Sequence, residues 1–138
     1  MSIPKTRALF ISHAWRYEEH YWKLVQWFND EPNFYWKNCS VPSTDSLPDK
    51  TSKGLSDAIT RQINPSQAVI FLGGMYAAYS DWIDYEIGEA LRMRKIIIGV
   101  RPWGAERVPI KVQQAAESNG MMVNWQSSSI IQAVRNLV

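Results

Sequence analysis

Short, solid apolar runs recur along the chain and are separated by longer segments with a different spacing. Residues 8–12, 67–72 and 95–100 are continuous apolar blocks, which is typical of strands buried on both faces of a parallel sheet. Residues 34–41 are rich in aromatic side chains, and residues 121–125 form one more short run of the same kind. The pattern therefore predicts five strands.

Between and after these runs, apolar residues recur three or four positions apart, as on one face of a helix. Asn-Pro, Asn-Gly and Asp-Glu-Pro sequences mark several of the ends. The segments that this spacing predicts as helices are residues 18–28, 55–63, 80–93, 108–117 and 127–138, with Ser127 or Ser128 as the cap of the last and Pro109 in the first turn of the fourth.

Strict alternation of strand and helix predicts an α/β fold with a parallel sheet covered on both faces. We expect a flavodoxin-like three-layer sandwich whose five-stranded sheet has the order 2-1-3-4-5. Ligands of such sheets bind outside the carboxyl ends of the strands, at the switch point between the first and third strands. Residues 12–16, the start of the long polar loop 42–54, and residues 73–80 should border that crevice.

The helix expected at residues 80–93 carries the most informative carboxylate. Ser80 suits an N-cap, and Trp82 and Glu86 lie one turn apart, with Glu86 expected at the edge of the apolar stripe and half shielded from water. A plain solvated glutamate is the alternative for Glu86. The expected stripe consists of Ile83, Ile87, Ala90 and Leu91.

Composition narrows the possible functions. The 138 residues fit a single domain, 1–138, and 46% apolar against 20% charged residues indicates a folded globular chain. A net charge of +2 without a Lys/Arg cluster disfavours nucleic-acid binding. The first residues lack a secretory pattern, and no apolar run reaches the roughly 20 residues needed to span a bilayer. We therefore expect a cytoplasmic protein without membrane contact.

Metal and disulfide chemistry find little support in the sequence. Cys39 is the only cysteine, which excludes an intrachain disulfide, and its place in an expected strand favours an inert core thiol. His13 and His20 have no His or Cys partner at ligand spacing. We expect no metal site.

Several polar and aromatic residues border the expected crevice. Ser12 and His13 end the first strand, where they could contact phosphate or ribose or instead satisfy local backbone groups. Ser43 and Asp45 either line the crevice or shape turns. Trp15, like Tyr76, has an aromatic ring suited to a ligand pocket.

Residues after the third and fourth strands give weaker signals. Gly73 and Gly74 would let the backbone approach a ligand, but neither a GxGxxG nor a Walker pattern is present. Arg101 and Trp103 could meet a diphosphate or a partner subunit, and a structural role is as consistent with their position.

Three stretches together resemble the Toll/interleukin-1 receptor (TIR) superfamily, and more narrowly the TIR-like domains of bacterial Thoeris anti-phage defence systems. They are FISHAW at 10–15, SVPSTDSLPD at 40–49, and SDWIDYEI at 80–87 following VIFLGG. In TIR enzymes the essential glutamate lies four residues after a tryptophan or its equivalent. The resemblance therefore implies that Glu86, four residues after Trp82, is catalytic.

The activity that the resemblance implies is cleavage of the bond between nicotinamide and ribose in NAD, with NAD as substrate and no cofactor. A signalling nucleotide would then activate a separate effector protein, and self-association with other TIR-like domains would align the site. The identity of the nucleotide, whether cyclic, linear or conjugated, stays open. The residues expected to bind substrate are Ser12, His13, Trp15, Ser43, Asp45, Tyr76 and Trp82.

Two other functions compete with this one. A non-catalytic TIR-like scaffold would act by association alone, through the 42–54 loop and the region of Trp103. A flavin or phospho-acceptor domain is disfavoured, because the first strand ends in Ser-His rather than in paired acidic residues or a Ser/Thr/Gly phosphate loop.

Overall fold

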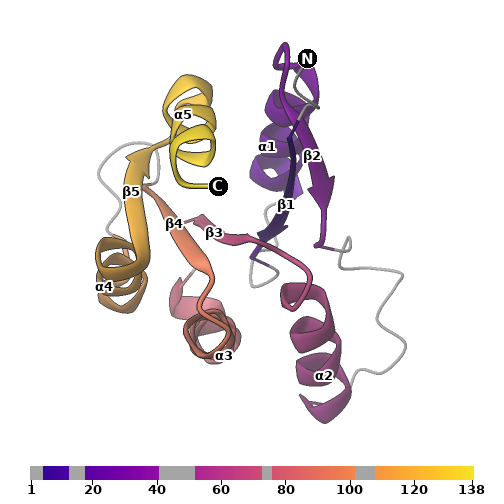
Figure 1. Ribbon diagram of the computed structural model, residues 1–138. Coiled ribbons are helices and arrows are strands. Elements are labelled where there is room, and N and C mark those ends of the chain that lie inside the picture. Colours follow the sequence, from indigo (N-terminus) through magenta and orange to yellow (C-terminus); the bar gives the residue numbers. More distant parts are fainter. Residues whose placement is uncertain (1–4, 13–17, 41–51, 73–75, 102–107) are drawn as a thin grey trace.

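A computed structural model describes residues 5–12, 18–40, 52–72, 76–101 and 108–138, with side chains for all of these except 18–19, 52–53, 55 and 76–82. Strands and helices alternate through these residues as the apolar pattern predicts (Figure 1). In chain order the elements are β1 (Thr6–Ile11), α1 (Glu18–Asp30), β2 (Tyr35–Asn38), α2 (Ser52–Ile63), β3 (Ala68–Leu72), α3 (Tyr76–Arg92), β4 (Ile96–Arg101), α4 (Ile110–Asn119), β5 (Gly120–Asn124) and α5 (Ser127–Leu137).

The five strands form one parallel sheet in the order β2-β1-β3-β4-β5, which confirms the predicted topology. In the register, Leu9 of β1 lies beside Asn38 of β2 on one side and Ala68 of β3 on the other. The chain builds outward from β1 to β2 and then returns to the other side of β1. The switch point of the sheet is therefore between β1 and β3.

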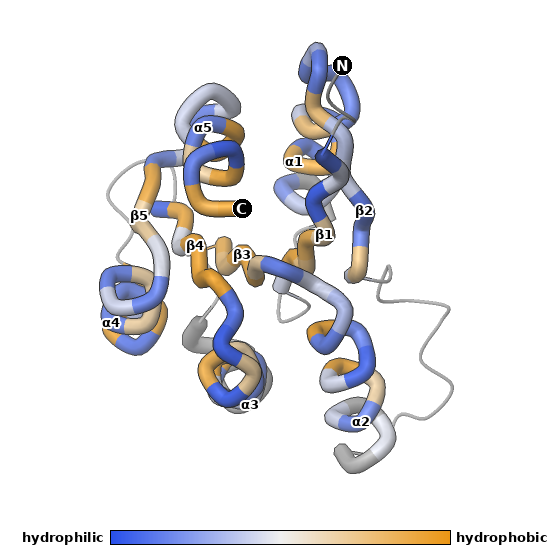
Figure 2. The backbone as a smooth tube through the Cα atoms, in the orientation of Figure 1, coloured by the Kyte–Doolittle hydropathy of each residue, from blue (hydrophilic) through white to orange (hydrophobic). Residues whose placement is uncertain are grey.

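Helices cover both faces of the sheet, so the molecule has three layers. Helices α1 and α5 lie on one face, and α2, α3 and α4 lie on the other (Figure 1). Side chains alternate between the two faces along each strand: Leu9 and Ile11 pack with α1 and α5, whereas Phe10 packs with α2 to α4. The hydrophobic residues concentrate in the central strands β3 and β4 (Figure 2).

Helix α3 begins at Tyr76, earlier than the predicted start at residue 80. Ser80 therefore lies inside the helix and is not its N-cap. The reason is the run that precedes it, Tyr-Ala-Ala-Tyr, which contains no helix breaker and two residues of the highest helix propensity. Leu91 is also corrected: it is 42% exposed and not part of the buried stripe, whereas Ile83, Ile87 and Ala90 are buried.

Other boundaries shift by a few residues. Strand β2 ends at Asn38, short of the predicted end at 41, and α2 begins at Ser52, three residues before the predicted start. Gln126, and neither of the serines after it, occupies the N-cap of α5, and Pro109 lies at the N-cap of α4, one position before its first turn. Among the described helices, none has the length and apolar character needed to cross a membrane.

Candidate functional site

Helix α3 places Glu86 inside the interface between the helix and the sheet. Ile83, Ile87 and Ala90 are buried against the strands, and Glu86 completes the same i, i+3, i+4, i+7 face. Its side chain is completely buried, at 0% exposed. The sequence-based expectation of a half-shielded carboxylate at the edge of the stripe is therefore wrong, because Glu86 lies within the stripe itself.

Glu86 reaches the carboxyl end of the first strand. Ser12, the residue that follows β1, donates a hydrogen bond from its Oγ to Oε1 of Glu86, with an O···O distance of 2.5 Å. The backbone N–H of Ser12 donates to the carbonyl oxygen of Ile70 in β3 at 2.8 Å. The end of β1, strand β3 and helix α3 therefore meet at this pair, 74 residues apart in sequence.

The pair lies at the switch point of the sheet, the edge at which doubly wound folds bind their ligands. Burying an ionisable carboxyl group costs free energy unless partners compensate it. A buried carboxylate at a ligand-binding edge is therefore a candidate functional group. Ser12, itself only 4% exposed, supplies part of the compensation, since an O–H donor stabilises a carboxylate.

A second polar network occupies the end of β2 at the same edge, on the α1 side of the sheet. Asn38 Nδ2 donates to the hydroxyl of Tyr21 at 2.9 Å, and that hydroxyl lies 3.0 Å from Ser40 Oγ. Asn38 Oδ1 accepts from both the backbone N–H and the hydroxyl of Ser40. Sequence reasoning missed this network. The signal was the polar–Cys–polar alternation of residues 38–40 at the end of a strand.

Cys39, between the two polar residues, is buried as expected. Burial raises the pKa of its thiol, and this outweighs the lowering effect of Lys37 and Lys95. The protonated thiol is a weak nucleophile, so Cys39 is not a candidate for covalent catalysis.

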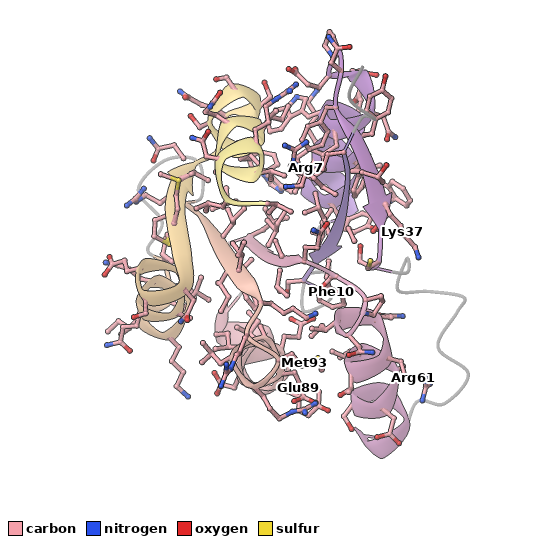
Figure 3. The ribbon with its side chains drawn as sticks, in the orientation of Figure 1. Arg7, Phe10, Lys37, Arg61, Glu89 and Met93 are labelled. Carbon is pink, nitrogen blue, oxygen red and sulfur yellow. The ribbon has the colours of Figure 1, made fainter. Side chains whose placement is uncertain are left out.

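One turn after Glu86, Glu89 has different surroundings. Glu89 lies on the side of α3 that is next to α2 (Figure 3). The hydroxyl of Thr60 in α2 donates to Oε1 at 2.7 Å, and the hydroxyl of Tyr85, one turn earlier on α3, donates to the same oxygen at 3.1 Å. Arg92 donates from Nε to Oε2 at 2.6 Å. The hydrogen bond from Arg92, followed by those from Thr60 and Tyr85, lowers the pKa of Glu89 to about 2 against the opposing effect of burial. Glu89 is therefore an anchored carboxylate between two helices.

The structure brings together two of the residues predicted from sequence, Ser12 and Glu86. Tyr76 and Trp82 lie on α3, and only their backbone is described. Arg101 ends β4 and is exposed. Among the described side chains, no three His, Cys, Asp or Glu residues cluster as metal ligands. The predicted residues outside the described ranges are His13, Trp15, Ser43, Asp45, Gly73, Gly74 and Trp103.

Comparison with protein-family models identifies the family of the chain. The model of the TIR-like domain of the Thoeris protein ThsB matches residues 10–107, a span that contains both Ser12 and Glu86. A sequence comparison with curated proteins finds no match.

Comparison with solved structures supports the fold. A conserved protein from Enterococcus faecalis V583 superposes with a TM-score of 0.69 at 12% identity, covering 97% of this chain and 100% of its own. A CMP N-glycosidase, BcmB, from Clostridium botulinum gives 0.59 at 13% identity, covering 94% and 99%. A diflavin flavoprotein A3 from Nostoc sp. gives 0.53 at 8% identity, covering 99% and 92%. At these identities the likeness is one of fold.

Proposed function

The chain belongs to the family of the TIR-like domain of the Thoeris protein ThsB, and from this premise we propose that it cleaves the N-glycosidic bond between nicotinamide and ribose in NAD. The observation that carries the proposal is the completely buried Glu86, bound to Ser12 at the switch point of the sheet. Family membership suggests a role in anti-phage defence, and we place the reaction there.

This reaction requires the protein mainly to position the substrate and to place a negative charge near the reacting carbon. The C1′–N bond breaks, its electron pair goes to the positively charged nicotinamide ring, and nicotinamide leaves neutral without an acid. Positive charge then develops on the ribose, as in other glycosidic cleavages. A carboxylate facing that charge stabilises the transition state more than the ground state. Glu86 has this role in the proposal.

The remaining residues predicted to bind substrate complete the proposal. Aromatic rings from Trp15, Tyr76 or Trp82 would stack on nicotinamide or adenine. His13, Ser43 and Asp45 would contact the ribose or the diphosphate. The nucleophile that captures C1′ determines the product: water gives ADP-ribose, and a group of the same molecule gives a cyclic nucleotide that could signal to an effector protein.

The fold shared with BcmB adds support of a general kind. That protein is a CMP N-glycosidase, so a sheet of this topology can carry N-glycosidic cleavage of a nucleotide. The likeness also identifies a competing substrate class, pyrimidine nucleoside monophosphates, which a test must separate from NAD.

The test incubates the wild type, Glu86→Gln and Glu89→Gln with NAD or with CMP, in dilute and in crowded solution. Chromatography measures the released base, and mass spectrometry identifies the nucleotide product. Glutamine keeps the length of Glu86 and an oxygen for Ser12, removes the negative charge, and replaces the second carboxylate oxygen with an NH2 donor. We expect the wild type to release nicotinamide, Glu86→Gln to lose about 100-fold or more, and Glu89→Gln to stay within about twofold.

Other results would overturn specific parts of the proposal. Cytosine release from CMP without nicotinamide release from NAD would overturn the choice of substrate. No release from either nucleotide in dilute or crowded solution would overturn the enzyme and favour a scaffold that acts by self-association, which light scattering would then detect as concentration-dependent assembly.

A further inference from the structure

We propose that Ser12 is a positioning residue that acts through Glu86, holding its carboxylate ionised and in one orientation at the switch point. The inference rests on the proposed function for the reaction, but its structural basis is independent of the substrate. It also differs from both roles considered for Ser12 from sequence, which were contact with phosphate or ribose and satisfaction of local backbone groups.

The first step of the argument is the rigidity of Ser12. Its backbone N–H is bound to the carbonyl oxygen of Ile70 at 2.8 Å, and Ile70 is completely buried in the central strand β3. The Cα of Ser12 is therefore tied to two strands of the sheet. A donor attached to such a frame adds no loop motion to the group that it binds.

The second step is direction. Side chains alternate along a strand, so Ser12 shares a face with Phe10, two residues earlier. Phe10 points from β1 toward the layer of α2 and α3 and packs in the same cluster as Ile83 and Ile87 (Figure 3). The hydroxyl of Ser12 therefore points to the buried face of α3, where Glu86 lies.

The third step is energy. The bond of 2.5 Å joins two side chains that are 4% and 0% exposed, so little water competes for either atom. Burial by itself favours the protonated carboxyl group, and an O–H donor opposes this effect because it stabilises the ionised form. The ionised form is the one that can face a positively charged ribose. Loss of the hydroxyl should therefore lower the fraction of Glu86 that is active near neutral pH.

The chain offers a matched control for this serine. Ser66 is equally buried, at 2% exposed, and its hydroxyl donates to the backbone carbonyl of Ile63 at 2.7 Å. It lies in the α2–β3 connection, ahead of β3 and so at the opposite edge of the sheet from Ser12. Ser66→Ala removes a buried hydroxyl and one hydrogen bond without touching Glu86.

The experiment measures kcat, KM and the pH–rate profile for the wild type, Ser12→Ala, Ser12→Thr and Ser66→Ala with NAD. We expect Ser12→Ala to lower kcat about tenfold and to leave KM within about twofold. The acidic limb of its pH–rate profile should move to higher pH by about one unit. Ser12→Thr keeps a hydroxyl and should recover part of both effects. Ser66→Ala should leave kcat and the acidic limb unchanged.

A second readout separates this inference from the proposed reaction. NMR follows the titration of the Glu86 carboxyl carbon in the wild type and in Ser12→Ala, without substrate. The signal is assigned by comparison with Glu86→Gln. If Ser12→Ala does not fold, Ser12→Cys takes its place. A midpoint that moves to higher pH supports the inference even if the wild type cleaves no NAD. An active wild type whose acidic limb and NMR midpoint are unchanged by these substitutions would overturn it.

Discussion

Glu86 and Glu89 lie one turn apart on α3, and the contrast between them shows how surroundings divide roles between identical side chains. Glu86 is completely buried and accepts its hydrogen bond from the neutral hydroxyl of Ser12 at the end of a strand. Glu89 is 13% exposed and accepts from the guanidinium of Arg92 and the hydroxyl of Thr60. The second carboxylate links two helices, whereas the first lies at the switch point of the sheet, where we propose that the reaction occurs.

Shortening each carboxylate by one methylene tests this division most strongly. Glu86→Asp keeps the charge but draws it back from the strand end, and a displacement of about 1 Å at a reacting centre can cost about 100-fold in kcat. Glu89→Asp should leave kcat within about twofold, because its carboxylate does not face the substrate in our proposal. Nicotinamide release gives kcat, and circular dichroism confirms the fold. Equal losses in both variants would assign the effect to the integrity of α3 instead.

The next largest effect is on stability and its pH dependence. The folded-state pKa of Glu89, about 2, lies below the ordinary value of 4.5, because Arg92, Thr60 and Tyr85 hydrogen-bond the carboxylate. Its contribution to folding is therefore complete above the unfolded pKa and is lost as the pH falls toward the folded one. Relative to Glu89→Gln, the wild type should gain about 1 kcal/mol at about pH 6, because water screens the exposed Arg92.

Urea unfolding of both proteins between about pH 6 and about pH 3 measures this gain, which should shrink steadily toward the acid end. A difference between them that stays constant over that range would mean that Glu89 is not held as a carboxylate by its partners.

The fold could be predicted because β1, β3 and β4 are short apolar blocks and the helices between the strands show apolar residues at helical spacing. Both signals are local, and the alternation of ten elements allows few topologies. The two wrong predictions were also local. The predicted helix began at residue 80, because the helix-forming run before it was assigned to the preceding connection. Leu91 was assigned to the buried stripe of α3, whereas the structure has Glu86 there and Leu91 exposed.

The candidate site was only partly predictable. Ser12 and Glu86 could each be selected from sequence, one at a strand end and the other four residues after Trp82. Their hydrogen bond could not, because it joins residues 74 apart and depends on where α3 crosses the sheet. The same holds for Glu89 and Thr60, 29 residues apart, which meet only because α2 and α3 are neighbours.

The link between α2 and α3 gives a smaller effect. Thr60 of α2 donates to Glu89 of α3, and the hydroxyl of Tyr85 lies within hydrogen-bond distance of both. A double-mutant cycle of Thr60→Val and Glu89→Met should give a coupling energy of about 1 kcal/mol in the free energy of unfolding, because each single change already breaks the shared bond. Purely additive losses would show that the hydrogen bond between Thr60 and Glu89 contributes nothing measurable to the link between the two helices.

The smallest effect concerns a third carboxylate of α3, Asp84, which is paired with Lys111 of α4 at 3.0 Å. The lysine side chain is 60% exposed and that of Asp84 is 35% exposed, so water screens the pair and ordering two side chains offsets much of the attraction. Lys111→Met should change the free energy of unfolding by less than about 0.5 kcal/mol and leave NAD cleavage unchanged. Urea unfolding at low and at high salt measures this change. A larger loss of unfolding free energy that disappears at high salt would show that charge alone can anchor α3. The buried surroundings of Glu86 and the shared hydroxyls of Glu89 would then no longer be what distinguishes these carboxylates.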